Sequence, residues 1–161
     1  MAKKGTIVAV CISSKGNVPK YPQEEVQVGQ YGFVGDIHAG ETRMSHRTKQ
    51  EKFNDRQVTL VAQEVLDSLN QELEIFLKPG DLAENITTEG LGDLSDILDG
   101  SLLQIGDRVV LKVTEQNNPC KNILVYHRLL VKNIYGRRGL LAIVKEGVDL
   151  RIRPGDIIQV L

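Results

Sequence analysis

The sequence predicts a mainly β fold, a closed or nearly closed β-barrel with small helical insertions, built as one domain over residues 1–161. Three observations lead to this prediction. The apolar and β-branched segments are short, Gly-Asp and Pro-Gly turns separate several of them, and only one segment has the regular spacing of an amphipathic helix. A chain of 161 residues is long enough to bury a core but short for two domains.

The first part of the chain contributes two inner strands to this prediction. Thr6 to Ile12 is a continuous apolar run, typical of a strand buried on both faces, and Arg56 to Val61 is rich in β-branched residues. A short strand is expected around Glu25 to Val28. The polar segment Glu41 to Asp55 has no periodicity, so we expect a mobile loop there.

Gln63 to Phe76 is the predicted helix. Its apolar residues recur every three or four positions and form one stripe, with acids on the opposite face. The stripe consists of Val65, Leu66, Leu69, Leu73 and Phe76. Pro79 and Gly80 follow and end the helix.

The second half of the chain is predicted to hold two hairpins, each closed by a turn that contains glycine. Their strands are Leu102 to Ile105 with Arg108 to Thr114, and Asp149 to Arg153 with Asp156 to Val160. Gly139 to Val144 is a further strand candidate. Ile123 to Ile134 is apolar and contains basic residues but no acid, and its periodicity fits either a helix or a pair of strands.

The composition, with 41% hydrophobic and 25% charged residues, is ordinary for a soluble globular protein. No apolar run approaches the roughly 20 residues that cross a bilayer. The first residues also lack the apolar region of a secretory signal. The two cysteines, Cys11 and Cys120, form at most one disulfide, which fits a reducing compartment. We therefore expect a cytoplasmic protein that does not associate with membranes.

The net charge of −1 hides a strong asymmetry along the chain. Residues 1–63 carry nine basic and six acidic residues, residues 64–99 one and ten, and residues 100–161 ten and five. If the two basic ends meet in the fold, they form a positive surface beside Cys120 that suits an anionic ligand; the alternative is that these charges are individually solvated. Nucleic acid is not expected as a partner, because there is no Trp, aromatic residues make up only 4%, and no dense basic stripe is present.

Cys120 is the residue with the clearest chemical potential. The predicted strand that ends at Thr114 meets asparagines and a proline, which resist continuing a ladder and place Cys120 in the loop beyond. The alternative is a buried structural thiol, but polar neighbours surround Cys120, whereas a core thiol has apolar ones. Cys11 lies within an apolar run and is expected to be such a core thiol.

The glycine-rich segment Tyr31 to Gly40 is a second candidate region, because its three glycines permit close approach of the backbone to another group. Asp36 and His38 share one face if this segment is extended. One hypothesis is a zinc site made by His38, His46 and Cys120, although no Cys-x-x-Cys or His-x-x-x-His pair supports it. The alternative is structural, with Asp36 capping the turn and His38 donating to it.

Four further polar residues lie in predicted turns. Lys15 and Lys20 belong to a loop rich in serine, glycine and proline, where we expect both to be available to an anion. Glu84 and Asn85 lie where a turn becomes a strand, so their side chains either bond to the backbone there or face a ligand.

Several separated segments resemble the MOSC domain, the C-terminal domain of molybdenum cofactor sulfurases, in the same order along the chain. They are Gly35-Asp36-Ile37-His38-Ala39-Gly40, Arg56-Gln57-Val58-Thr59-Leu60, Pro79-Gly80-Asp81-Leu82-Ala83-Glu84-Asn85-Ile86-Thr87, Leu103-Gln104-Ile105-Gly106, Pro119-Cys120 and Pro154-Gly155-Asp156. The resemblance spans nearly the whole chain, which is similar to a stand-alone MOSC protein. It implies a fold that resembles the β-barrel domain of pyruvate kinase.

The resemblance implies two alternative roles for Cys120, and each needs a partner. In the first, Cys120 is the metal ligand of the molybdenum cofactor (molybdopterin), in an oxidoreductase component that acts on N-hydroxylated compounds with electrons from a donor protein. In the second, Cys120 carries sulfur as a persulfide for metal-sulfur cluster or cofactor assembly, supplied by a pyridoxal phosphate enzyme of the cysteine desulfurase type. A third hypothesis is a module that binds the cofactor without turnover.

The resemblance also implies which residues surround the site. Arg56 matches a basic position that holds the cofactor phosphate, and Asp36, His38, Glu84 and Asn85 fall in motifs around it. From the basic ends of the sequence and this match, we expect Lys15, Arg43, Arg56, His38 and Cys120 to converge on one cleft. The sequence leaves the substrate, the donor and the oligomeric state open.

Overall fold

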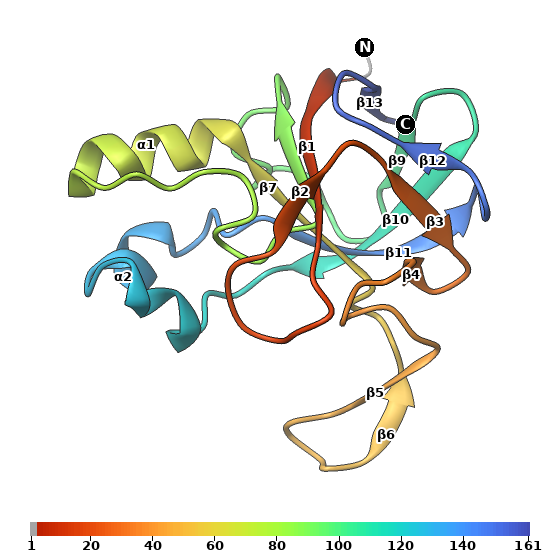
Figure 1. Cartoon of the computed structure of the whole chain (residues 1–161), viewed down its shortest axis with the longest axis horizontal. Helices are drawn as coiled ribbons and strands as arrows, with labels where there is room; N and C mark the ends of the chain where they lie inside the picture. The colour runs from red at the N-terminus through yellow and green to blue at the C-terminus, as the bar shows by residue number, and fades with distance from the viewer. Residues whose placement is uncertain (1–2) are drawn as a thin grey trace.

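Seven strands close into a β-barrel (Figure 1) in the structure of this chain, a computed structural model that describes residues 3–161. The order around the barrel is β13-β9-β10-β11-β7-β8-β1, and pairing of β13 with β1 closes it. The strands are β1 (Lys4–Ile12), β7 (Val58–Ala62), β8 (Ile86–Glu89), β9 (Leu102–Ile105), β10 (Val109–Gln116), β11 (Leu140–Glu146) and β13 (Ile157–Val160). The predicted mainly β barrel with small helical insertions is confirmed.

Neighbouring strands of the barrel run antiparallel, except for the parallel pair β7 and β8. The helix α1 (Gln63–Leu73) follows β7 directly and precedes β8, as the crossover that a parallel pair requires. The remaining strands are β2 (Tyr21–Gln23), β3 (Val26–Gly29), β4 (Gly32–Phe33), β5 (Thr42–Met44), β6 (Glu51–Phe53) and β12 (Arg151–Ile152). Strands β12, β3 and β4 form a small second sheet.

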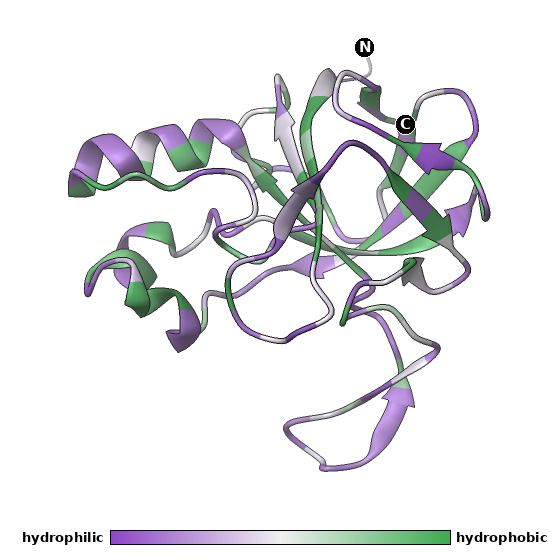
Figure 2. Cartoon of the chain, in the orientation of Figure 1, coloured by the Kyte–Doolittle hydropathy of each residue, from purple (hydrophilic) through white to green (hydrophobic). Residues whose placement is uncertain are grey.

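Aliphatic side chains fill the barrel, and Figure 2 shows its strands as mostly apolar. All five residues of β7 are buried, because the barrel interior lies on one face and α1 packs beside the other. Each fully buried leucine or isoleucine contributes roughly 1.5–3 kcal/mol relative to an exposed one. The barrel is therefore the rigid part of the molecule, and the loops at its ends are free to hold functional side chains.

The helix α1 is confirmed, but its predicted extension to Phe76 is wrong. The helix ends at Leu73, and Glu74 adopts a left-handed conformation with φ of 54° that turns the chain away from the helix axis. Phe76 therefore leaves the apolar stripe and is 95% exposed, whereas Val65, Leu66 and Leu69 are buried against the barrel.

The predicted hairpin at the C-terminal end is also wrong, although both of its strands exist. Strand β12 pairs with β3, and β13 pairs with β9 and β1. The turn between them bonds to β1, since Gly155 N–H donates to the Ile7 carbonyl and Ile7 N–H donates to the Asp156 carbonyl. The turn thus carries the chain from the small sheet into the barrel. The hairpin of β9 and β10 is confirmed.

The polar segment 41–55 is a β-hairpin and not the expected irregular loop. Strands β5 and β6 pair antiparallel, and the hairpin extends away from the barrel (Figure 1). Its strands are polar (Figure 2), and none of their side chains is buried, so no alternation of apolar residues was available to predict them. Side chains hold it instead: Thr42 Oγ1 donates to Glu51 Oε1 at 2.5 Å, and Arg43 Nε donates to Asp55 Oδ1 at 2.7 Å.

The segment after Cys120, for which helix and strand were both open, is helical. It forms the short 3₁₀ helix η1 (Lys121–Val125) and the helix α2 (Leu130–Ile134), which lies beside α1 (Figure 1). Among residues 3–161, no helix combines the length and the apolar character that crossing a membrane requires.

Candidate functional site

Cys120 lies exposed at the end of the loop that follows β10. Its Sγ contacts Asn122 Oδ1, and the backbone at Cys120 is extended, immediately before η1. The alternative of a buried core thiol at this position is therefore wrong. Cys11 is the core thiol, as expected: it is fully buried, and burial, reinforced by the Glu84 carboxylate, raises the pKa of its thiol to about 12.

Cys120 lines a cavity of about 320 Å³ whose walls contain no Asp or Glu among the described residues. The lining residues are His38, His46, Arg56, Thr59, Leu82, Ala83, Asn117, Asn118, Cys120, Asn122, Arg138 and Leu141. The ionisable groups in this wall are thus a thiol, two imidazoles and two guanidinium groups. A cavity of this composition suits an anion, because its wall offers N–H donors and positive charge and contains no carboxylate of its own.

Arg138 is the unusual member of this wall, and the sequence reasoning did not identify it. Its side chain is only 5% exposed, and Nη2 donates to the Leu82 carbonyl at 2.8 Å, but Nε and Nη1 have no partner. Each buried donor left without a partner costs roughly 1–3 kcal/mol. Burial lowers the pKa of Arg138, while the nearby Cys120 sulfur and Glu84 carboxylate act in the opposite direction.

The one sequence signal for Arg138 is its place between Arg137 and Gly139, directly before β11. Gly139 has a φ of 112°, and a Cβ there would lie 1.9 Å from the Leu60 carbonyl oxygen, so only glycine fits. The chain must enter β11 in close contact with β7. This close contact directs the side chains of Arg137 and Arg138 to opposite sides of the backbone. Arg137 turns outward to Glu72 at 2.6 Å, and Arg138 turns inward to the cavity.

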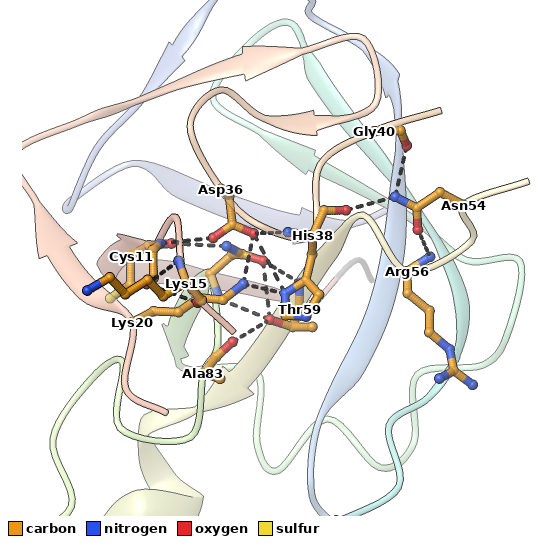
Figure 3. Close-up of polar contacts among 12 residues, drawn as sticks. Cys11, Lys15, Lys20, Asp36, His38, Gly40, Asn54, Arg56, Thr59 and Ala83 are labelled. Atoms are coloured by element: carbon orange, nitrogen blue, oxygen red, sulfur yellow. Dashed lines mark hydrogen bonds and ion pairs between the residues drawn. The ribbon is translucent and has the colours of Figure 1, made fainter. Parts of the chain in front are cut away.

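Arg56 lines the cavity and also a neighbouring one of about 330 Å³. Asn54 Oδ1 accepts a hydrogen bond from the Arg56 backbone N–H, and the side chain extends away from the residues around Asp36 (Figure 3). Its Nε donates to Glu115 Oε1 at 3.1 Å, which leaves the terminal nitrogens for a ligand. Arg43 lines the neighbouring cavity, where it is paired with Asp55.

Asp36 and His38 form a cluster with Lys20 (Figure 3). Lys20 Nζ lies 2.8 Å from Asp36 Oδ2 and 2.8 Å from His38 Nδ1, and the side chains of Lys20 and Asp36 are fully buried. The expectation that Lys20 remains available to an anion is thus wrong. Burial, and then the charge of Lys20, lower the pKa of His38, while Asp36 opposes them. Burial also lowers the pKa of Lys20, again against Asp36.

Glu84 and Asn85 are fully buried and bonded to the protein itself. Asn85 Oδ1 accepts the Thr59 N–H at 3.0 Å, and its Nδ2 donates to the Cys11 carbonyl at 3.0 Å. Glu84 Oε1 accepts the Leu82 N–H at 3.2 Å, and burial raises the pKa of its carboxyl to about 7. Neither residue lines the two cavities, and neither does Asp36 or the exposed Lys15.

Two residues of the hypothetical zinc site, His38 and His46, line the same cavity as its third residue, Cys120. Within residues 3–161, however, no three His, Cys, Asp or Glu side chains are arranged to hold a metal ion. Of the residues expected to converge, the structure brings Cys120, Arg56 and His38 to one cavity, places Arg43 at the adjoining one, and leaves Lys15 outside both.

The fold and this cavity define a class of protein: a closed β-barrel with an exposed cysteine in the wall of a cavity that contains no carboxylate among the described residues. The chain belongs to the MOSC domain family, whose model matches residues 34–159.

Solved structures with a similar fold include the YuaD protein from Bacillus subtilis, 23% identical, which covers 99% of this chain and 98% of its own with a TM-score of 0.85. YiiM from Geobacillus stearothermophilus is 21% identical over 98% of this chain and 75% of its own, with a TM-score of 0.72. YiiM from Escherichia coli is 18% identical over 97% of this chain and 69% of its own, with a TM-score of 0.60. At these identities the likeness shows the fold alone. No curated protein sequence matches the chain.

Proposed function

We propose that this protein holds a molybdenum cofactor as one component of an oxidoreductase that acts on N-hydroxylated compounds, with Cys120 as the ligand to molybdenum. The observation that carries the proposal is the exposed thiol of Cys120 in the wall of an acid-free cavity that also contains two unpaired, buried nitrogens of Arg138. Membership of the MOSC domain family supports the choice of cofactor.

The residues of the cavity suit such a cofactor in two respects. A thiolate is a soft ligand, the kind that suits a thiophilic metal centre. A guanidinium group binds phosphate through two parallel N–H donors, and both Arg138 and Arg56 have nitrogens without a protein partner. When bound, the cofactor supplies the metal centre at which the substrate is reduced. The chain itself holds this group by Cys120, orients its anionic part by the two arginines, and provides a volume in the range of ligand sites.

An electron-donor protein is part of this proposal. Iron-sulfur clusters are usually held by four cysteine thiolates, and this sequence has two cysteines, of which Cys11 is buried in the core. We therefore assign the supply of electrons to a partner. We also propose a cytoplasmic location, because both thiols are free, and an exposed free thiol such as Cys120 persists in a reducing compartment.

The second candidate function is sulfur transfer, and the position of Arg138 near the Cys120 sulfur favours it. The Cys120 thiolate attacks the outer sulfur of a persulfide on a cysteine desulfurase, a pyridoxal phosphate enzyme. A new S–S bond forms on Cys120, the S–S bond of the donor breaks, and the donor cysteine leaves as a thiolate. The resulting persulfide is an anion, and the unpaired nitrogens of Arg138 would stabilise it.

The test is the analysis of molybdenum and pterin in protein purified from a host that makes the cofactor. We expect both in the wild type. Cys120→Ser should fold, since surface changes stay within roughly 0.5 kcal/mol, and should lose molybdenum, because serine is a hard oxygen donor. Arg138→Met should reduce the content of pterin. The matched controls are Cys11→Ala, which removes the other thiol, and Arg137→Met, whose side chain turns away from the cavity.

Two results would contradict the cofactor proposal. Wild-type protein without molybdenum or pterin, carrying a mass increase of about 32 Da on Cys120, would favour the sulfur carrier. Equal cofactor content in Cys120→Ser and wild type would show that the cofactor does not depend on this thiol.

A further inference from the structure

The buried Lys20 contacts His38 in a way that limits where the imidazole carries its proton. Lys20 is held in place by its backbone, because its N–H donates to the Gly80 carbonyl at 2.8 Å and a Cβ at residue 80 would lie 2.2 Å from the Lys20 carbonyl oxygen. Its Nζ then reaches Asp36 Oδ2 and His38 Nδ1, each at 2.8 Å (Figure 3).

The charge of Lys20 decides the direction of its bond to His38. Asp36 accepts hydrogen bonds from the N–H groups of Ser13 and His38 as well as from Lys20, and it is fully buried. An ammonium is the form of Lys20 that leaves no buried carboxylate unpaired. An ammonium only donates, so His38 Nδ1 accepts, and in a neutral imidazole the proton must then be on Nε2.

We infer that Lys20 fixes His38 as the neutral tautomer protonated at Nε2, so that His38 presents an N–H donor to an anionic or oxygen-bearing ligand in the cavity of Cys120. His38 lines that cavity, its side chain is 45% exposed, and no described residue bonds to Nε2. Lys20 is then a positioning residue. The ligand part of this inference rests on the proposed function; the tautomer does not.

The contact between Lys20 and His38 also argues against His38 as a zinc ligand. A metal ion at Nε2 would require the proton to move to Nδ1, where Lys20 Nζ already donates. Protonation of both nitrogens is opposed in the same way, because it would place two cations 2.8 Å apart. His38 thus adds to the donors that Arg138 and Arg56 direct at the cavity, and ligand groups near it must be acceptors.

The tautomer is tested by NMR of the free protein labelled with ¹⁵N in histidine. The chain has three histidines, and the variants His46→Gln and His127→Gln assign their signals. We expect His38 to show a protonated Nε2 and an unprotonated Nδ1 at neutral pH, and to take up its second proton at a lower pH than a free histidine does. The groups that face this pair are Asp36, Glu84 and Cys11, so the titration is followed on the whole cluster.

Lys20→Met should change this result, because the imidazole then faces Asp36, whose Oδ2 lies 3.8 Å from Nδ1. His38 should then take up its second proton at a higher pH than it does in the wild type. If the unpaired Asp36 prevents folding, the double variant Lys20→Met with Asp36→Asn removes both charges and should return His38 to the mixture of tautomers of a free histidine. Lys3→Met, which breaks an exposed pair with Asp96, is the control and should leave His38 unchanged.

The effect on ligand binding is read from the cofactor content of His38 variants. His38→Gln keeps an N–H donor and should retain molybdenum and pterin, whereas His38→Ala should retain about tenfold less. A protonated Nδ1 in the wild type, or ordinary titration of His38 with Lys20 in place, would overturn the inference. If no variant binds the cofactor but the tautomer is as expected, the proposed function fails and the role of Lys20 stands.

Discussion

At the scale of single residues, the interior of this protein contains more charge than its sequence suggests. Lys20, Asp36, Glu84 and Arg138 are all at least nine-tenths buried, and all four lie in loops or turns. Burying a charge is costly unless it is paired, and Lys20 and Asp36 form such a pair, whereas Glu84 and Arg138 both bond to the backbone of Leu82. The buried charges thus fix the geometry of the site, and pH should affect its stability.

Glu84 gives the first prediction of this kind. Burial raises the pKa of its carboxyl from 4.5 to about 7, against the opposing effects of backbone hydrogen bonds and Arg138. Since the folded pKa lies above the unfolded one, the folded state binds the proton more tightly. The free energy of unfolding therefore falls as pH rises from about 4.5 to about 7, by about 3 kcal/mol at most.

Glu84→Gln removes this titration. Urea unfolding at about pH 5 and about pH 8 should show that the variant gains stability relative to the wild type only at the higher pH. Glu89→Gln, at an exposed position of β8, is the control. An equal difference between Glu84→Gln and wild type at both values of pH would contradict the prediction.

The residue scale also shows what sequence reasoning missed. Cys120 and Arg56 were predictable, since a cysteine among polar residues and an arginine before a strand are visible as patterns, and both line the cavity. Arg138 and Lys20 were not, because a charged side chain in a loop is normally exposed. Their burial depends on two glycines, Gly139 and Gly80, that bring backbone segments together from distant parts of the chain.

At the scale of elements, the junction of β7 and β11 holds one wall of the site in place. Gly139 begins this junction with a φ of 112°, and the space for its missing Cβ is occupied by the backbone of Leu60. The helix α1, the strand β7 and the hairpin of β9 and β10 were predicted correctly because each has an apolar pattern of its own. The hairpin of β5 and β6 has none, and the pairing of β12 with β3 depends on contacts far apart in sequence.

Gly139→Ala tests the junction. The new methyl group would lie 1.9 Å from a carbonyl oxygen, so either β7 or β11 must move, and we expect a loss of about 3 kcal/mol or more in the free energy of unfolding. Gly136→Ala is the matched control: it has a φ of 84° with nothing within 4 Å, and should cost only about 1 kcal/mol of backbone strain. Equal losses in the two variants, measured by urea unfolding, would refute the argument.

At the scale of the whole molecule, closure of the barrel depends on β13, the last strand. Ile158 pairs with Ile105 of β9 and with Gly5 of β1, so one short strand joins the two ends of the sheet. The closed or nearly closed barrel was predictable from many short strands, but the strand that closes it was not, because β13 was expected to pair with its neighbour in sequence, β12. Strand order in a closed sheet is decided by the packing of the whole core.

Ile158→Ala should therefore cost about 2–5 kcal/mol, because Ile158 is fully buried in the core. Its neighbour Ile157 is 50% exposed, and Ile157→Ala should change the free energy of unfolding by less than about 1 kcal/mol. Thermal unfolding followed by circular dichroism distinguishes the two. If both substitutions lower the free energy of unfolding equally, burial of Ile158 is not what stabilises the closed barrel.

The hairpin of β5 and β6 has a consequence for how such a protein can evolve. None of its strand residues is buried in the core, yet Thr42, Arg43 and Met44 line the neighbouring cavity, which shares His38, His46 and Arg56 with the cavity of Cys120. Changes in these residues alter the shape of this neighbouring cavity while the barrel keeps its stability. Selection can therefore act on ligand preference at this hairpin almost independently of selection on folding. Substitutions within the hairpin alone would allow descendants of one barrel to acquire different substrates.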